Sequence, residues 1–142
     1  METTSIRAED ITRNWYLVDA ENQILGRLAS KVSHLLRGKN KPYFTAHMDM
    51  GDFVVIVNAE KVKVSGNKDI DKTYFRHSGY PGGITNVNLS KLREQQPELI
   101  IANAVKGMLP RNRLGRKLLK HLKIYKTEVH PHKSQQPKMI TL

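Results

Sequence analysis

The sequence of 142 residues contains no cysteine, which excludes disulfide bonds, thiolate zinc sites and a cysteine nucleophile. Six histidines are left as soft metal ligands. No apolar stretch approaches the ~18 residues of a membrane span, and residues 1–10 carry acidic side chains without an apolar run. We therefore expect no secretory signal and no membrane partner. Together these absences favour a protein of the cytoplasm.

Acidic residues are also scarce, because 13 Asp and Glu stand against 24 Lys and Arg, a net charge of +11. This excess points to a polyanionic partner. It is concentrated in residues 106–133, which hold nine basic residues and one acidic residue, a net +8, whereas the rest of the chain carries +3. The hydrophobic content of 39% is enough for a folded core, and the length suits one domain.

Apolar patterns predict the first half of the fold. Residues 15–20 form an aromatic and β-branched run typical of a buried strand. Residues 25–36 repeat apolar side chains at helical spacing, with Gly38 placed to end the helix. Residues 53–57 are apolar without alternation, which predicts a central strand covered on both faces, as in a parallel sheet. Residues 61–64 fit either an alternating strand or one helical turn.

The second half alternates strand patterns with helix patterns. Ser90 is placed to cap one helix, and Pro97 suits the first turn of the next. Strands that alternate with helices imply an α/β fold with a largely parallel sheet. The expected elements are a strand at residues 73–75, a turn-rich loop at 77–83, helices at 91–96, 97–107 and 112–121, and a strand at 122–125.

Residues 106–126 carry the sharpest local signal. At ~100° per residue, four leucines gather on one side of a helix and five cations lie on the opposite side. A solvated face is the usual explanation of a charge run. Here no acids are interspersed to form ion pairs, so the like charges repel one another and a polyanion would relieve that cost. The leucines are Leu114, Leu118, Leu119 and Leu122, and the cations are Arg113, Arg116, Lys117, Lys120 and Lys123.

Three other basic segments are weaker candidates for contact with a polyanion. The first follows a helix, where lysine also simply complements the helix dipole. The second is a loop of cations, glycines and a tyrosine, suited either to stacking on unpaired bases or to an ordinary turn. The third is a Gly- and Pro-containing turn that either lets backbone N–H groups approach an anion or simply ends a helix. Their candidate contacts are Lys39 and Lys41, Arg76 and His77, and Lys106 and Arg111.

Catalytic and metal sites have little support. His47, Asp49 and Asp52 form a compact group that fits acid–base or metal chemistry, but no second histidine and no cysteine stands near them in the sequence. His130 and His132 flank a proline in a tail that makes a poor rigid zinc site. The glycine motifs of nucleotide-binding enzymes are missing too. We therefore expect no catalytic residues, metal, cofactor or small-molecule substrate.

The sequence resembles, nearly end to end, the bacterial ribosomal protein thirteen family of the large subunit. Each matching block is weak alone, but their joint order over residues 14–137 is highly specific, and Lys-Gly-Met-Leu-Pro is the most diagnostic block. Met50 and Ser134 depart from the family's usual threonine and alanine. The blocks are residues 15–20, 25–29, 47–52, 58–62, 66–68, 77–79, 82–83, 105–110, 115–116, 122–125 and 135–137.

This resemblance implies a three-layer α/β/α fold around a four-stranded parallel sheet. It also implies a non-catalytic protein that binds 23S ribosomal RNA, joins the large subunit early in assembly and contacts neighbouring ribosomal proteins. The chain then divides into a variable N-terminal extension at residues 1–13, a single α/β RNA-binding domain at 14–127 and an extended tail at 128–142.

We therefore interpret the sequence as a structural RNA-binding protein of the large ribosomal subunit. Phosphate contacts would position it, and RNA shape would be recognised. Two alternatives are a small α/β enzyme acting on a phosphorylated or nucleotide substrate, and a free nucleic-acid-binding regulator. The central candidate contacts are Arg111, Arg113, Arg116, Lys117, Lys120 and Lys123, and the secondary ones are Lys39, Lys41, Arg76, His77 and Lys106.

Overall fold

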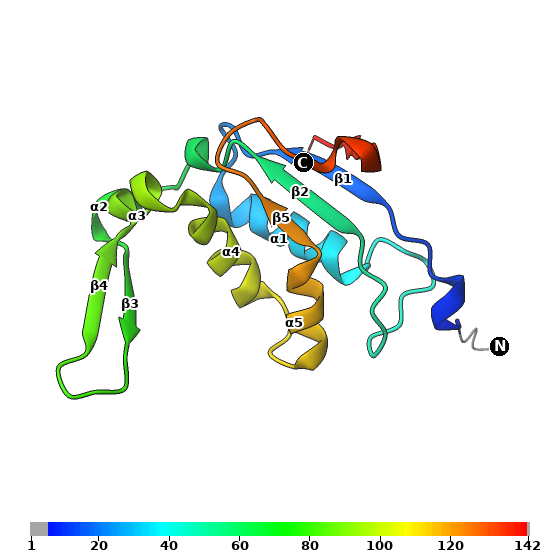
Figure 1. Ribbon diagram of the computed structural model, residues 1–142, viewed down its shortest axis with the longest axis horizontal. Helices are drawn as coiled ribbons and strands as arrows, with labels where there is room; N and C mark the ends of the chain where they lie inside the picture. The colour runs from blue at the N-terminus through cyan, green and yellow to red at the C-terminus, as the bar shows by residue number, and fades with distance from the viewer. Residues whose placement is uncertain (1–5, 142) are drawn as a thin grey trace.

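The computed structural model describes residues 6–141 (Figure 1). Its main sheet contains β1 (Trp15–Asp19), β2 (Phe53–Val57), β5 (Leu122–Ile124) and β6 (Lys138–Met139), in the order β5-β2-β1-β6. Every neighbouring pair is parallel, and β2 lies inside the sheet. The predicted α/β class and four-stranded parallel sheet are confirmed. Residues 1–5 of the expected N-terminal extension and residue 142 of the expected tail lie outside the described residues.

One face of the sheet is covered by α1 (Leu25–Arg37), α4 (Pro97–Met108) and α5 (Arg113–Lys120), which also contact one another (Figure 1). Alternate side chains of β1 and β2, among them Val18 and Ile56, point into this layer and are buried. The core therefore lies between the sheet and these helices. Burying each such side chain stabilises the fold by roughly 1.5–3 kcal/mol. Across residues 6–141, no helix is both long and apolar enough to cross a membrane.

Helix α1 ends where the sequence predicts. Gly38 follows its last residue with a φ of 76°, and its N–H points to the carbonyl oxygens of His34 and Leu35. A Cβ at this position would lie 2.5 Å from the carbonyl oxygen of Met50. Glycine therefore satisfies both the left-handed backbone conformation and the close approach of the chain that returns to β2.

The opposite face of the sheet is covered by the C-terminal segment. Val55 points to that face and is fully buried. The segment forms a 3-10 turn, η3 (His132–Gln135), before β6 pairs with β1. The His132 ring lies 5.3 Å from the Trp15 ring, and its Nε2 lies 2.7 Å from the Tyr125 hydroxyl. The third layer is thus thin, and the expected extended tail also supplies an edge strand.

A two-stranded antiparallel hairpin projects from this body (Figure 1). The predicted strand at residues 73–75 is confirmed and is longer than expected, whereas the second strand was not predicted. Its pattern carries no period-two signal because Tyr74 and Val87 alone among the strand residues are half-buried and the others are exposed. The elements are β3 (Thr73–His77) and β4 (Ile84–Asn88), with α2 (Lys68–Asp71) and α3 (Leu89–Gln95) at the base.

Two local predictions are settled by the backbone. The segment after β2, which fits either a strand or a helical turn, contains both: the 3-10 turn η2 (Ala59–Lys61) is followed by a parallel bridge between Lys63 and Ile24. The prediction that Ser90 caps a helix is wrong, because α3 begins at Leu89, two residues before the expected start, and Asn88 occupies the N-cap position. Before β1, residues 8–10 form a further 3-10 turn, η1 (Ala8–Asp10).

Candidate nucleic-acid interface

A tight turn joins α4 to α5 and fixes the position of the basic helix. The Gly115 N–H donates a hydrogen bond of 2.8 Å to Oδ1 of Asn112, which caps the helix. Gly115 also packs against the carbonyl oxygen of Pro110, and any Cβ at residue 115 would overlap that oxygen. Because residue 115 has no side chain, α5 begins directly against the turn.

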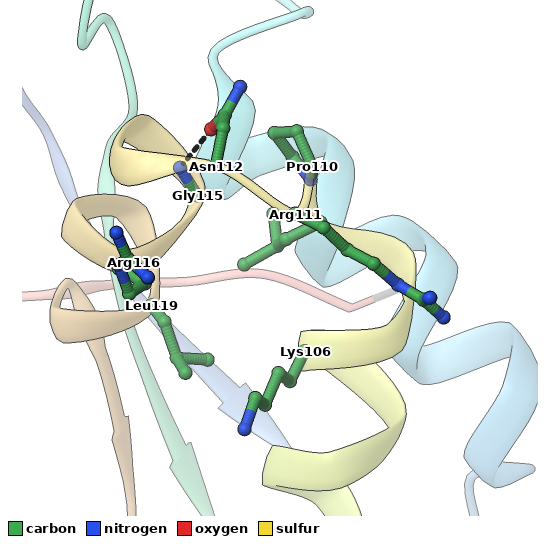
Figure 2. A pocket seen from close by; sticks show the side chains of 8 residues that line it. Lys106, Pro110, Arg111, Asn112, Gly115, Arg116 and Leu119 are labelled. Carbon is green, nitrogen blue, oxygen red and sulfur yellow. Dashed lines mark hydrogen bonds between the residues drawn. The ribbon is translucent and has the colours of Figure 1, made fainter.

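The turn and the two helices surround a cavity of about 280 Å³ (Figure 2). Leu109 and Leu119 give it apolar walls, and three cations stand around it. In Figure 2, Lys106 comes from α4, Arg111 from the turn and Arg116 from α5. None of the eight described residues that line the cavity is acidic. Its charge therefore favours an anion, and the arginine forks suit phosphate oxygens.

Helix α5 has the two faces that the sequence predicts. Leu118 is buried, Leu114 and Leu119 are half-buried against the core, and the cations point to solvent. Together with Lys106 of α4 and Arg111 of the turn, they make no ion pair with an acidic side chain anywhere in residues 6–141. We call this set the α5 surface: Lys106, Arg111, Arg113, Arg116, Lys117 and Lys120.

Lys123 lies apart from the α5 surface. It sits on β5 in register with Val55 of β2, and paired residues of a parallel ladder point to the same face. That face is the one covered by the C-terminal segment. On this face, the pKa of His132 lies below its ordinary value. The main cause is burial, and the charges of Lys123 and His130 add to it. Placing Lys123 on the cationic helix face is therefore wrong, because the helix ends at Lys120.

Lys41 is buried, with 8% of its surface exposed. Its Nζ lies 2.8 Å from Oδ1 of Asp52 and donates hydrogen bonds to the carbonyl oxygens of Thr12 at 2.6 Å and Met50 at 2.8 Å. These partners use all three donors of the ammonium group, so none is left for RNA. The predicted RNA contact at Lys41 is thus replaced by a structural role, in which Lys41 neutralises buried Asp52. Its neighbour Lys39 is exposed.

Arg76 and His77 lie on β3 of the hairpin, and both are exposed. Nδ1 of His77 accepts a hydrogen bond of 2.9 Å from the Gly79 N–H, which orients the ring toward the hairpin tip. Arg76 lies outside the α5 surface, but it lines a second cavity that Lys106 also lines. Lys106 therefore links the hairpin to the α5 surface, because it lines both cavities.

The group of His47, Asp49 and Asp52 does not assemble into one site. His47 is exposed, and Asp52 is fully buried in its ion pair. Oδ2 of Asp49 lies 3.3 Å from the Arg13 guanidinium and 3.6 Å from Nε2 of His121. The pKa of His121 is lowered chiefly by burial, against the attraction of Asp49. In the part of the chain that the structure describes, no three His, Asp or Glu side chains gather closely enough to hold a metal ion.

Two large apolar side chains of the hairpin are exposed, which was not predicted from the sequence. Phe75 and Ile84 are 80% and 63% exposed. Apolar residues are assigned to a core by default, and the signal against that assignment lies in their cross-strand partners. Phe75 faces Asn86, and Ile84 faces His77. An apolar residue paired across the strands with a polar one indicates a strand face that is not part of the core.

The chain matches the family model of ribosomal protein L13 over residues 13–131. It is similar to the large ribosomal subunit protein uL13 of Nitratidesulfovibrio vulgaris, with 54% identity over 142 residues, 100% of this chain and 99% of the relative. It is 52% identical to uL13 of Geobacter sulfurreducens over 143 residues, and 51% identical to uL13 of Burkholderia vietnamiensis over 142 residues, with 100% of both chains covered in each case.

Proposed function

The chain belongs to the ribosomal protein L13 family, and we propose on that premise that it binds 23S ribosomal RNA through the α5 surface. The resemblance found in the sequence blocks is confirmed. The family is a structural component of the large ribosomal subunit and not an enzyme, so the alternative of a small α/β enzyme is set aside. As a bacterial ribosomal protein of this kind, the chain works in the cytoplasm.

One observation carries the RNA-binding proposal. The six cations of the α5 surface have no acidic partner within the described residues, and three of them surround one cavity. Neighbouring like charges on a helix cost the folded protein a few tenths of a kcal/mol per pair. RNA phosphates remove this repulsion, and each neutralised phosphate releases a condensed counterion.

The fold holds these cations in place before RNA arrives. Leu118 is buried in the core, Gly115 packs on Pro110, and Asn112 caps the helix. A surface that is already ordered loses little conformational entropy on binding. This supports a protein that joins the large subunit early in assembly, before neighbouring proteins are present to order it.

Secondary contacts extend the proposal beyond α5. Lys39, Arg76 and His77 are exposed and form the second group of proposed RNA contacts, and Lys123 stays a separate prediction on the opposite face of the sheet. Neighbouring ribosomal proteins are the further partners. Exposed apolar side chains of the C-terminal segment support this part of the proposal. One of them is Val129, which is 77% exposed.

The test is the salt dependence of binding between the full chain and 23S ribosomal RNA. If each of the six cations neutralises one phosphate, log K falls with log salt at a slope of roughly −4 to −5, at ~0.7–0.9 per phosphate. The double variant Arg116→Gln with Lys117→Gln should flatten this slope by about 1.5.

The matched control removes the same charge elsewhere. Lys133 and Lys138 are exposed on the C-terminal segment, across the sheet from α5. Replacing both by glutamine should leave the slope nearly unchanged. A slope near zero for the natural protein, or an equal change in both double variants, would contradict RNA binding through the α5 surface.

A further inference from the structure

The hairpin and α4 enclose a second and larger cavity, open to solvent, of about 940 Å³. Its walls come from β3, β4, α3 and α4, and they combine rings, aliphatic side chains, amides and hydroxyls with two cations. The cations are Arg76 on the hairpin side and Lys106 on the helix side. None of the eleven described lining residues is acidic. This groove is therefore positive and partly apolar.

The groove continues the α5 surface. Lys106 lines both the groove and the smaller cavity beside Arg111 and Arg116. In Figure 1, α4 stands between the hairpin and α5, so one extended ligand that lies on α5 reaches the groove by crossing α4 at Lys106. The charge of the two sites has the same sign throughout, which favours a continuous polyanion.

Aromatic rings stand on the outer face and at the tip of the hairpin that forms one wall of the groove. The Phe75 side chain is 80% exposed and points to the strand face opposite Arg76, because side chains alternate along β3, and Tyr80 at the tip is 76% exposed. The tip is closed by two backbone hydrogen bonds of 3.0 Å, from the Ser78 N–H to the Gly83 carbonyl oxygen and from the Gly83 N–H to the Tyr80 carbonyl oxygen. Tyr80 is thus carried by an ordered turn, and both rings offer a face that nothing in the described chain covers.

We propose that the groove and the hairpin beside it bind an unpaired segment of RNA, with phosphates at Arg76 and Lys106 in the groove and bases stacked on Phe75 and Tyr80, on the outer face and at the tip of the hairpin. The proposal rests on the proposed function and adds the class of RNA structure at this place. A duplex keeps its base faces stacked inside, whereas an unpaired strand presents them to aromatic side chains. The uniform positive charge and the shared Lys106 favour RNA over a protein partner as the occupant.

The test compares two RNA probes bound to the full chain: a short unstructured oligouridine and a blunt-ended duplex of the same length. The variant Phe75→Leu with Tyr80→Leu keeps apolar area but removes both rings. It should weaken oligouridine binding by at least about fivefold, the factor that corresponds to the lower end of measured base-stacking energies, and leave duplex binding unchanged. Ile84→Ala, which removes exposed apolar area from the same hairpin and no ring, should change neither affinity.

The outcomes separate this proposal from the proposed function. Oligouridine binding that is unchanged by the double leucine variant, or an equal loss for both probes, would overturn the groove as a site for unpaired RNA. Ultraviolet crosslinking of the complex with 23S ribosomal RNA gives a second readout, because stacked rings should crosslink through residues 75 and 80. If crosslinks appear elsewhere and the α5 variants still flatten the salt slope, the groove proposal fails while the proposed function stands.

Discussion

Strand β2 and the projecting hairpin use apolar side chains in opposite ways. In β2, Val54, Val55 and Ile56 are fully buried, from the helices on one face and the C-terminal segment on the other. In the hairpin, Phe75 and Ile84 remain mostly in water. The first set stabilises the fold and is satisfied within the chain. The second set contributes little to folding, so its surface is available to a partner outside the chain.

The cations show the same division. Lys41 lies inside the body, where Asp52 and two carbonyl oxygens satisfy its ammonium group. The six cations of the α5 surface lie outside and have no acidic partner among residues 6–141. The buried cation Lys41 thus serves the fold, whereas the exposed cations of the α5 surface are left without an acidic partner. Substitutions in the body should therefore destabilise the fold, whereas substitutions on the outer surfaces should weaken binding.

The largest expected effect on stability is at the buried ion pair. Lys41→Met leaves the fully buried Asp52 carboxylate without its cation, which should lower the free energy of unfolding by about 3–5 kcal/mol. Urea unfolding followed by circular dichroism measures this change. Lys39→Met is the matched control, because Lys39 is exposed two residues away and should shift stability by less than about 0.5 kcal/mol. Equal losses in the two variants would contradict the assignment of Lys41 to the interior.

One substitution made in both regions tests the apolar comparison directly. Ile56→Ala removes a fully buried side chain of β2 and should cost about 2–5 kcal/mol of stability. Ile84→Ala makes the same chemical change on the hairpin, where the side chain is 63% exposed, and should cost less than about 0.5 kcal/mol. Thermal unfolding of both variants gives the difference. A large loss from Ile84→Ala would mean that the hairpin is packed into the fold after all.

The smallest effect concerns the sheet face under the C-terminal segment. The lowered pKa of His132 means that the folded state favours the neutral ring. As pH falls below about 6.5, the unfolded chain takes up a proton that the folded chain resists, so stability should decrease. Above that pH the penalty is absent.

The single tryptophan makes this pH dependence measurable. Trp15 lies 5.3 Å from the His132 ring, so its fluorescence follows the docking of the C-terminal segment during urea unfolding. The midpoint should be lower at acidic pH than at neutral pH. His132→Phe keeps an aromatic ring without a titrating group and should show a smaller difference. A difference as large as that of the natural protein would assign the effect to other groups, such as His121.

The body of the fold was predictable because its burial leaves a pattern. Residues 53–57 form β2 with the expected bounds, and Gly38 ends α1 as expected. The hairpin strand β4 left no such pattern, since its residues face solvent and its stability comes from pairing with β3. A strand that is buried against its own chain can thus be recognised from its sequence pattern, whereas a strand exposed to solvent cannot.

The sequence predicted what kind of site this is, but only some of the residues that form it. Charge without interspersed acids identified the α5 surface, because repulsion within a helix is a local property. Lys41 was misplaced since its partner Asp52 is distant in the sequence, and basic residues look alike until their partners are known. Lys123 was misplaced because it was counted with the helical run of cations, although the strand expected at residues 122–125, and found as β5, turns its side chain to another face.

Sucrose-gradient sedimentation of a cell extract tests the central claim most directly. A protein that belongs to the large ribosomal subunit through contacts of α5 with RNA should sediment with the large-subunit fractions, together with 23S ribosomal RNA. The variant in which all six cations of the α5 surface are replaced by glutamine should move toward the top of the gradient while it still unfolds cooperatively. If the natural chain stays at the top with free proteins, the chain is a free regulator and the account is contradicted.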